Sequence, residues 1–289
     1  VIRRRIEKAA SVAGINELYL ASLSCRSIIY KGMFLAQDVA EFYPDLKDDR
    51  FESAFALYHQ RYSTNTFPQW WLAQPFRMLA HNGEINTLKG NINWMKSHEI
   101  RMSSDAFGDM AEDIKPIIAS GSSDSAALDS VFEMLVRAGR NAPMAKTMLI
   151  PESWSKQAVD LPKPWIDMYS YCNSVMEPWD GPAALTMTDG RWVCAGLDRN
   201  GLRPMRYVVT GDGLLIAGSE AGMVYVDESS VKEKGALGPG QLLAVDMADG
   251  RLYHDKEMKN LLAGSQDFGE WVDRINELDQ DLGKAVETP

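Results

Sequence analysis

The second half of the chain contains three short turn sequences, each lying between two apolar, β-prone segments. Asp189-Gly190 separates PAALTMT from RWVCAGL, the Gly-Asp-Gly turn at 211–213 separates MRYVVT from LLIAG, and the Ala-Asp-Gly turn at 248–250 separates QLLAVDM from RLYHD. Glycine tolerates the positive φ angles that tight hairpin turns require, and aspartate is frequent beside it. Three successive hairpins predict an antiparallel sheet in this half of the chain.

The first half of the chain contains further segments that are typical of strands. Residues 18–30 and 51–63 alternate or have an apolar middle, and both are rich in β-forming side chains. A third such segment, 74–80, leads into Asn82-Gly83, a dipeptide that favours a turn. We therefore expect strands in these three segments and a turn at Asn82-Gly83.

Between the two groups of strands, apolar residues recur at helical spacing. One helix is expected to begin at Ser122 or Ser123, either of which can cap it, and to end at Gly139. The other helices that the spacing predicts are 32–42, 87–103 and 165–176.

The order of the elements, with strands first, then helices and then strands, predicts the α+β class. The simplest arrangement is two antiparallel sheets packed face to face, with helices outside them. We assign residues 1–258 to this domain and residues 259–289 to a linker. The linker is polar and has only a weak helical pattern around Trp271, Ile275 and Leu278.

Composition excludes several classes of function. The formal net charge is −10, whereas a nucleic-acid-binding protein usually presents a basic surface. No apolar run approaches the roughly 18 residues that a membrane-spanning helix needs. The three cysteines are odd in number and far apart, which fits a reducing cytoplasm and predicts neither disulfides nor a metal cluster.

Residues 59–95 concentrate side chains that suit a binding site. Arg61 follows a predicted strand, and its planar guanidinium can bind a carboxylate through two parallel hydrogen bonds. Asn82 and Gly83 place a side-chain amide beside an unhindered backbone N–H, which is the pair of donors that an oxyanion hole requires. A salt-bridged strand end and an ordinary turn are the alternatives, and His81, which precedes them, is more often structural than a catalytic base.

Asp124 follows the predicted capping serines. Its carboxylate suits a helix N-terminus, and it equally suits the ammonium group of a ligand. Together with Arg61, Asn82 and Gly83 it matches a free amino acid with a side-chain amide, glutamine or asparagine, that undergoes acyl transfer. The residues supply no clear nucleophile, because each cysteine lies in an apolar pattern and has no histidine at a suggestive spacing.

The segments that carry these residues resemble one known family. HQRYSTNTFPQW, LAQPFRMLAHNGEINTLKGNINWM, GSSDSAALD, YCNSVMEPWDGPAAL and DRNGLRPMRY are similar to the amidotransferase domain of glutamate synthase large subunits, a class II (N-terminal nucleophile) glutamine amidotransferase. The similarity extends over about 30–254. It implies the αββα sandwich of N-terminal nucleophile hydrolases. It also implies hydrolysis of L-glutamine to glutamate and ammonia, the ammonia passing to a domain that makes glutamate from 2-oxoglutarate.

The resemblance assigns a role to each candidate residue. Arg61 would hold the glutamine α-carboxylate with the help of Thr64, and Asp124 would hold the α-ammonium group. The Asn82 side chain and the Gly83 N–H would stabilise the oxyanion. No cofactor is expected in this segment. A fused synthase domain and a small NADPH-oxidising subunit are the implied partners, and FMN, an iron–sulfur cluster and NADPH would serve those other parts.

The sequence departs from the family pattern at the nucleophile. The family uses a cysteine at the amino terminus of the mature chain, and Cys25 is internal and has no free amine. We therefore expect a fragment that lacks its first strands and is inactive alone. A glutamine-binding module without catalysis, or another class II enzyme such as an amidophosphoribosyltransferase, is the alternative. The context of Tyr62 and Phe67 favours the NADPH-dependent type of glutamate synthase.

Overall fold

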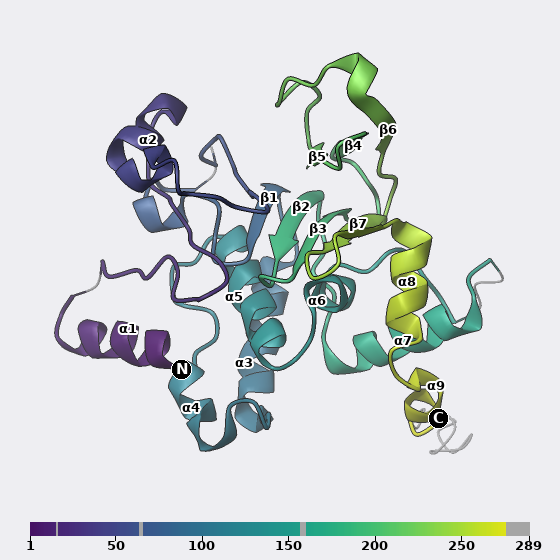
Figure 1. The fold of residues 1–289 in the computed structure, drawn as a ribbon. Helices are drawn as coiled ribbons and strands as arrows, with labels where there is room; N and C mark the ends of the chain where they lie inside the picture. Colours follow the sequence, from purple (N-terminus) through teal and green to yellow (C-terminus); the bar gives the residue numbers. More distant parts are fainter. Residues whose placement is uncertain (16, 64–65, 157–159, 276–289) are drawn as a thin grey trace, which may run out of the picture.

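The computed structural model describes residues 1–289 except 16, 64–65, 157–159 and 276–289. Its larger sheet has five antiparallel strands in the order β1-β2-β3-β7-β8, and its smaller sheet has three in the order β5-β4-β6 (Figure 1). The strands are β1 (Leu79–Gly83), β2 (Ala183–Thr188), β3 (Trp192–Leu197), β4 (Arg206–Thr210), β5 (Leu215–Gly218), β6 (Val231–Ala236), β7 (Leu242–Asp246) and β8 (Arg251–Tyr253).

All three hairpins that the turn sequences predict are present. They join β2 to β3, β4 to β5 and β7 to β8, and in each case the two strands pair antiparallel. The φ angles of Gly190, Gly213 and Gly250 are 88°, 92° and 68°, so each turn uses the positive φ that glycine permits. The α+β prediction, with two antiparallel sheets and flanking helices, is confirmed.

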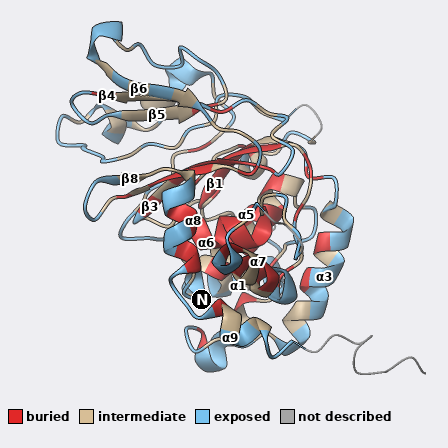
Figure 2. Ribbon diagram, turned by 90° about the vertical axis from the view of Figure 1, so that its right-hand side faces the viewer, coloured by how far each residue is buried: buried red, intermediate tan, exposed pale blue. Residues whose placement is uncertain are grey.

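Most of the helices lie on one side of the larger sheet, and the smaller sheet lies on the other side (Figure 2), whereas α2 lies apart from both (Figure 1). The helices are α1 (Ile2–Val12), α2 (Val39–Phe42), α3 (Leu88–Arg101), α4 (Ala111–Ile114), α5 (Asp124–Arg137), α6 (Ala142–Leu149), α7 (Lys163–Val175), α8 (Asp255–Ala263) and α9 (Phe268–Val272). The main core fills the space between the larger sheet and α5 to α8. A smaller apolar cluster, formed by Ala184, Ala195, Leu197 and Met205, lies on the opposite face of the sheet.

The predicted helices are confirmed where apolar spacing was clear. These are α3, α5 and α7, and Ser123 caps α5 because its Oγ accepts the Ala126 N–H at 3.2 Å. The sequence did not predict α6. All eight residues of α6 are buried, so this short helix has no solvent-exposed face that would mark it in the sequence.

The predicted strands at 18–30 and 51–63 are wrong, because both segments are irregular. A strand needs the backbone of a neighbour, and here side chains bind the backbone instead. The Ile29 N–H, for example, donates to Ser22 Oγ at 3.3 Å. The third predicted strand begins later than expected and continues through Asn82-Gly83, which is part of β1 rather than a turn.

The domain boundary predicted after Met258 is also wrong. Helix α8 crosses this position, and Leu262 and Phe268 beyond it are 1% and 3% exposed within the main core. The packed body therefore extends at least to the end of α9. Trp271 lies in α9, whereas Leu278 lies outside the described residues.

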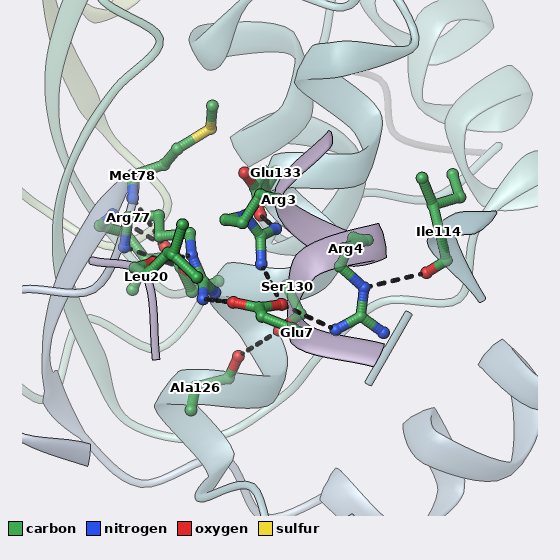
Figure 3. A network of polar contacts seen from close by, with 12 residues as sticks. Arg3, Arg4, Glu7, Leu20, Arg77, Met78, Ile114, Ala126, Ser130 and Glu133 are labelled. Carbon is green, nitrogen blue, oxygen red and sulfur yellow. Dashed lines mark hydrogen bonds and ion pairs between the residues drawn. The ribbon is translucent and has the colours of Figure 1, made fainter. Parts of the chain in front are cut away.

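Helix α1 is joined to the body by a network of charged side chains (Figure 3). Arg3 bonds Glu133 on α5 at 2.5 Å, and Glu7 accepts a hydrogen bond from Arg77, just before β1, at 2.9 Å. The Arg77 backbone N–H in turn donates to Asp129 of α5. The network therefore connects α1, α5 and the start of β1, and a cavity of about 1000 Å³ lies among these elements.

Candidate functional site

The end of β1 presents the two predicted oxyanion donors. Hydrogen bonds in an antiparallel pair alternate along the strand. The Thr188 N–H donates to the Met78 carbonyl, and the Glu84 N–H donates to the Pro182 carbonyl at 2.9 Å, so the even-numbered residues of β1 bond to β2. The N–H of Gly83 therefore points to the open edge of β1, away from β2.

The backbone of His81 follows the same alternation, because its N–H and its carbonyl also face the open edge of β1 and not β2. The Gln74 side chain lies along the open edge, where its Oε1 accepts the His81 N–H at 2.6 Å and its Nε2 donates to the His81 carbonyl at 2.8 Å. Gln74 therefore pairs with the backbone groups of His81 that face the open edge of β1. Gly83 is the next residue along the strand whose backbone N–H faces that edge.

Position 83 accepts only glycine because the backbone of Pro182, just before β2, approaches it closely. A Cβ atom there would lie 1.8 Å from the Pro182 carbonyl oxygen and 2.8 Å from His81 Nε2. The contact with Pro182 involves backbone, which cannot move aside cheaply. The sequence indicated a turn glycine at 83, and the structure shows a different reason for it, close packing inside the sheet.

Asp124 holds the segment that follows β1. Its Oδ2 accepts the backbone N–H of Ile85 at 2.9 Å, and its Oδ1 accepts the N–H of Ser125 at 2.7 Å. Its Oδ1 also accepts the Ser125 hydroxyl at 3.2 Å. A carboxylate has about four acceptor sites, so these three bonds leave room for one more donor. Asp124 is half-buried at the first turn of α5, where the helix dipole also stabilises its negative charge.

His81 is buried beneath the N-terminus of α5. Only 2% of it is exposed, and its Nδ1 lies 2.8 Å from Ser125 Oγ. Burial lowers the pKa of His81, although the nearby Asp124 carboxylate acts in the opposite direction. Its Nε2 is buried and has no hydrogen-bond partner among the described residues. The sequence favoured a structural role for His81 and gave Ser125 no role of its own, although Ser125 belongs to the acidic turn that contains Asp124.

A cavity of about 160 Å³ lies between the two sheets beside β1. His59, His81 and Asn82 line it together with residues of the smaller sheet such as Ala217. Burial lowers the pKa of His59 as well. The segment that leads to Arg61 therefore reaches the same end of β1 as Asn82.

Asn82 and Gly83 lie at the end of β1, and Asp124 binds the backbone of Ile85, two residues beyond Gly83. Arg61 is exposed, and no hydrogen bond or ion pair of its guanidinium with Asn82, Gly83 or Asp124 is present. Thr64, the other predicted carboxylate ligand, lies outside the described residues.

The cysteines lie in different settings. Cys25 is exposed, whereas Cys172 and Cys194 are buried. Burial raises the pKa of Cys172 to about 12 and raises that of Cys194 well above its usual value. The two buried thiols are therefore protonated and unreactive at neutral pH. Among the described residues, no group of three or more His, Cys, Asp or Glu could hold a metal ion. No helix in this part of the chain has the length and apolarity to cross a membrane.

Comparison with known proteins identifies the class. The family model for class II glutamine amidotransferases matches residues 1–271, and the chain belongs to this family.

Several relatives are large enzymes. The chain is 62% identical over 280 residues to the glutamate synthase [NADPH] large chain of Azospirillum brasilense, covering 97% of this chain and 18% of that protein. It is 46% identical over 273 residues to the glutamate synthase [NADPH] large chain of Bacillus subtilis, covering 94% and 18%. It is 46% identical over 275 residues to ferredoxin-dependent glutamate synthase 2, chloroplastic, of Arabidopsis thaliana, covering 94% and 17%. The chain thus spans less than a fifth of the length of these relatives.

Among solved structures, a glutamine phosphoribosylpyrophosphate amidotransferase from B. subtilis matches with a TM-score of 0.35 and 19% sequence identity. The match covers 68% of this chain and 34% of that one.

Proposed function

We propose that this chain is the glutamine-hydrolysing domain of a glutamate synthase large chain, of the NADPH-dependent type. Membership of the class II family and the 62% identity to an NADPH-dependent large chain support this proposal. Synthesis of glutamate from 2-oxoglutarate, with FMN, an iron–sulfur cluster and NADPH, would take place in other parts of a cytoplasmic enzyme. The fused synthase domain and a small NADPH-oxidising subunit would be the protein partners.

The observation that carries the proposal is the Asn82-Gly83 pair at the open end of β1. When a nucleophile attacks the side-chain amide of glutamine, negative charge develops on the amide oxygen. The Gly83 N–H, which points away from β2, and the Asn82 side-chain amide would stabilise that charge. Because β1 is held in the sheet, these donors need little rearrangement as the charge forms.

Recognition of the substrate would use the charged residues around this strand. Asp124 would accept the α-ammonium group in addition to the backbone N–H of Ile85. Arg61 would bind the α-carboxylate with the help of Thr64. The exposure of the Arg61 guanidinium leaves its donors available for such a contact.

We further propose that none of Cys25, Cys172 and Cys194 is the nucleophile. The raised pKa of the two buried thiols opposes thiolate formation, and Cys25 lies on the exposed irregular segment 18–30. In this family an amino-terminal cysteine attacks the amide carbon. The leaving nitrogen takes up the proton that the thiol has lost, the C–N bond breaks and ammonia departs, and water then hydrolyses the resulting thioester to glutamate and the free thiol.

Ammonia release from glutamine by the full-length polypeptide that carries this chain tests the proposal. Asn82→Ala should lower kcat by roughly 100- to 1000-fold, as is typical when an oxyanion donor is lost. Asn93→Ala, on the exposed surface of α3, is the matched control and should leave kcat unchanged. Unchanged turnover in Asn82→Ala would refute the oxyanion role. If the unmodified polypeptide binds glutamine without releasing ammonia, the chain is a binding module.

A further inference from the structure

The proposed oxyanion segment is attached to α5 on both sides. Before it, His81 Nδ1 lies 2.8 Å from Ser125 Oγ, and after it, the Ile85 N–H donates to Asp124 at 2.9 Å. Gly83 lies midway between these two contacts. Beyond the Glu84–Pro182 hydrogen bond the chain leaves the sheet, so the strand ladder alone does not fix this segment.

The His81 ring also packs directly against Gly83. A Cβ atom at position 83 would lie 2.8 Å from His81 Nε2, so the ring occupies the space beside the glycine Cα. Residues 81 and 83 share one face of the strand, because side chains alternate along it. A change in the ring's position would therefore shift the Gly83 backbone, which carries the proposed oxyanion donor.

Ser125 connects the ring to the proposed ammonium ligand. Its Oγ lies 3.2 Å from Asp124 Oδ1 as well as 2.8 Å from His81 Nδ1. One hydroxyl thus bridges Asp124 and His81.

We propose that His81 and Ser125 are positioning residues: together they set the Gly83 N–H relative to Asp124, and so couple the binding of the substrate ammonium group to stabilisation of the oxyanion. This inference rests on the proposed glutaminase activity and adds two residues to it. Neither residue contacts the substrate. Their loss should weaken the chemical step and leave ground-state binding of glutamine nearly unchanged.

Steady-state glutaminase kinetics of the full-length polypeptide test this inference. Ser125→Ala should lower kcat by roughly 10- to 100-fold, the effect of a small misplacement of a catalytic group, with KM and the inhibition constant of glutamate within about twofold. Ser130→Ala is the matched control, since Ser130 lies on the same helix and, among the residues that the structure describes, its Oγ bonds only the Ala126 carbonyl. It should retain full activity.

Two substitutions of His81 provide the second arm. The side-chain amide of His81→Asn can replace Nδ1 as a partner for Ser125, so this variant should keep more activity than His81→Leu. If the two residues act through one contact, the double variant Ser125→Ala/His81→Asn should lose little more than the worse single variant.

The outcomes separate the two proposals. An unmodified polypeptide that releases no ammonia would refute the proposed function. An active polypeptide in which Ser125→Ala has unchanged kcat, or in which the fold losses of the two single variants multiply, would refute only the positioning role. Equal changes in KM and kcat in both His81 variants would assign His81 a purely structural role and also overturn the inference.

Discussion

The carboxylate of Asp129 on α5 accepts the backbone N–H of Met78 at 2.8 Å, across 51 residues of sequence. The same carboxylate accepts the N–H groups of Arg77 and Leu79, each at 3.1 Å. It therefore satisfies three consecutive donors at the point where the chain enters β1. Asp129 is only 1% exposed, so no solvent could replace it.

Asp129→Asn should destabilise the fold. Asparagine keeps one acceptor oxygen but places an N–H₂ group against a backbone N–H, leaving buried donors unsatisfied. We expect a loss of roughly 1–3 kcal/mol in the free energy of unfolding, measured by urea denaturation of the purified chain. Asp249→Asn is the control, because Asp249 is exposed, accepts the Arg251 N–H and lies in a hairpin turn that also suits asparagine. Equal stability of the two variants would contradict the role of Asp129.

Gly83 and Gly90 should respond in opposite directions to substitution by alanine. At Gly83 the added methyl group would collide with the Pro182 carbonyl, so Gly83→Ala should lower both stability and glutaminase activity. Gly90 lies within α3, and a methyl group added to it would meet no other part of the fold within 4 Å. Gly90→Ala should therefore stabilise the protein by about 0.5–1 kcal/mol. Thermal unfolding of both variants checks the signs. Similar destabilisation at the two positions would show that the approach of Pro182 does not determine the effect.

The three hairpins within residues 181–253 could be predicted well from the sequence because their structure is local, whereas β6, which pairs with β4, was not predicted. The turn at Asp189-Gly190 and the two later turns join strands that are neighbours in the sequence, so each pairing follows from its own residues. The segments 18–30 and 51–63 have comparable β-forming composition but no strand partner. The composition of a segment indicates its tendency to adopt an extended backbone. A strand also requires a second backbone segment beside it with which its N–H and carbonyl groups can pair.

The candidate site could be predicted only in part, because only some of its features depend on residues that are close together in the sequence. Asn82 and Gly83 are adjacent, and their donor chemistry is visible in the sequence. The contact of Ile85 with Asp124 joins residues 39 positions apart, and the contact of His81 with Ser125 joins residues 44 apart. Such contacts depend on how α5 crosses the end of β1, which no local pattern encodes.

Thiol reactivity should differ sharply among the cysteines. Burial raises the pKa of Cys172 and of Cys194, whereas Cys25 is exposed. Iodoacetamide at mildly alkaline pH should therefore modify Cys25 in the native chain, and all three should react after unfolding; mass spectrometry of peptides gives the extent at each position. If our proposal about the nucleophile is right, Cys25→Ala leaves the glutaminase turnover of the full-length polypeptide unchanged. Loss of turnover in that variant would assign the nucleophile to Cys25.

Two buried lysines differ in their surroundings. Lys146 and Lys259 are each 2% exposed. The Lys259 ammonium lies 2.9 Å from both Glu152 and Asp255, whereas Lys146 forms no ion pair with a described residue. Burial, and then repulsion from Lys259, lower the pKa of Lys146 to about 8. Its charge is therefore costly to the folded state, while that of Lys259 is compensated.

Substitution by methionine should separate the two lysines. Lys146→Met keeps the length of the side chain and removes the costly charge, so it should raise the free energy of unfolding at neutral pH by roughly 1–3 kcal/mol. Lys259→Met leaves two buried carboxylates without their partner and should lower it by roughly 3–5 kcal/mol. Chemical denaturation of the two variants provides the comparison. Destabilisation of similar size in both would show that Lys146 is compensated by its surroundings.

The pH dependence of Lys146 has a definite sign. The pKa of Lys146 falls from the ordinary 10.5 to about 8 in the folded state. At a pH between these two pKa values, the unfolded chain therefore carries the proton more often than the folded chain does. The penalty is fully present below about pH 8 and is relieved as the pH rises toward 10.5. The advantage of Lys146→Met over the unmodified chain should therefore shrink as the pH rises from about 8 to 10.5, which denaturation at a series of pH values would measure. An advantage that stays constant across that range would mean that the folded and unfolded chains bind this proton equally.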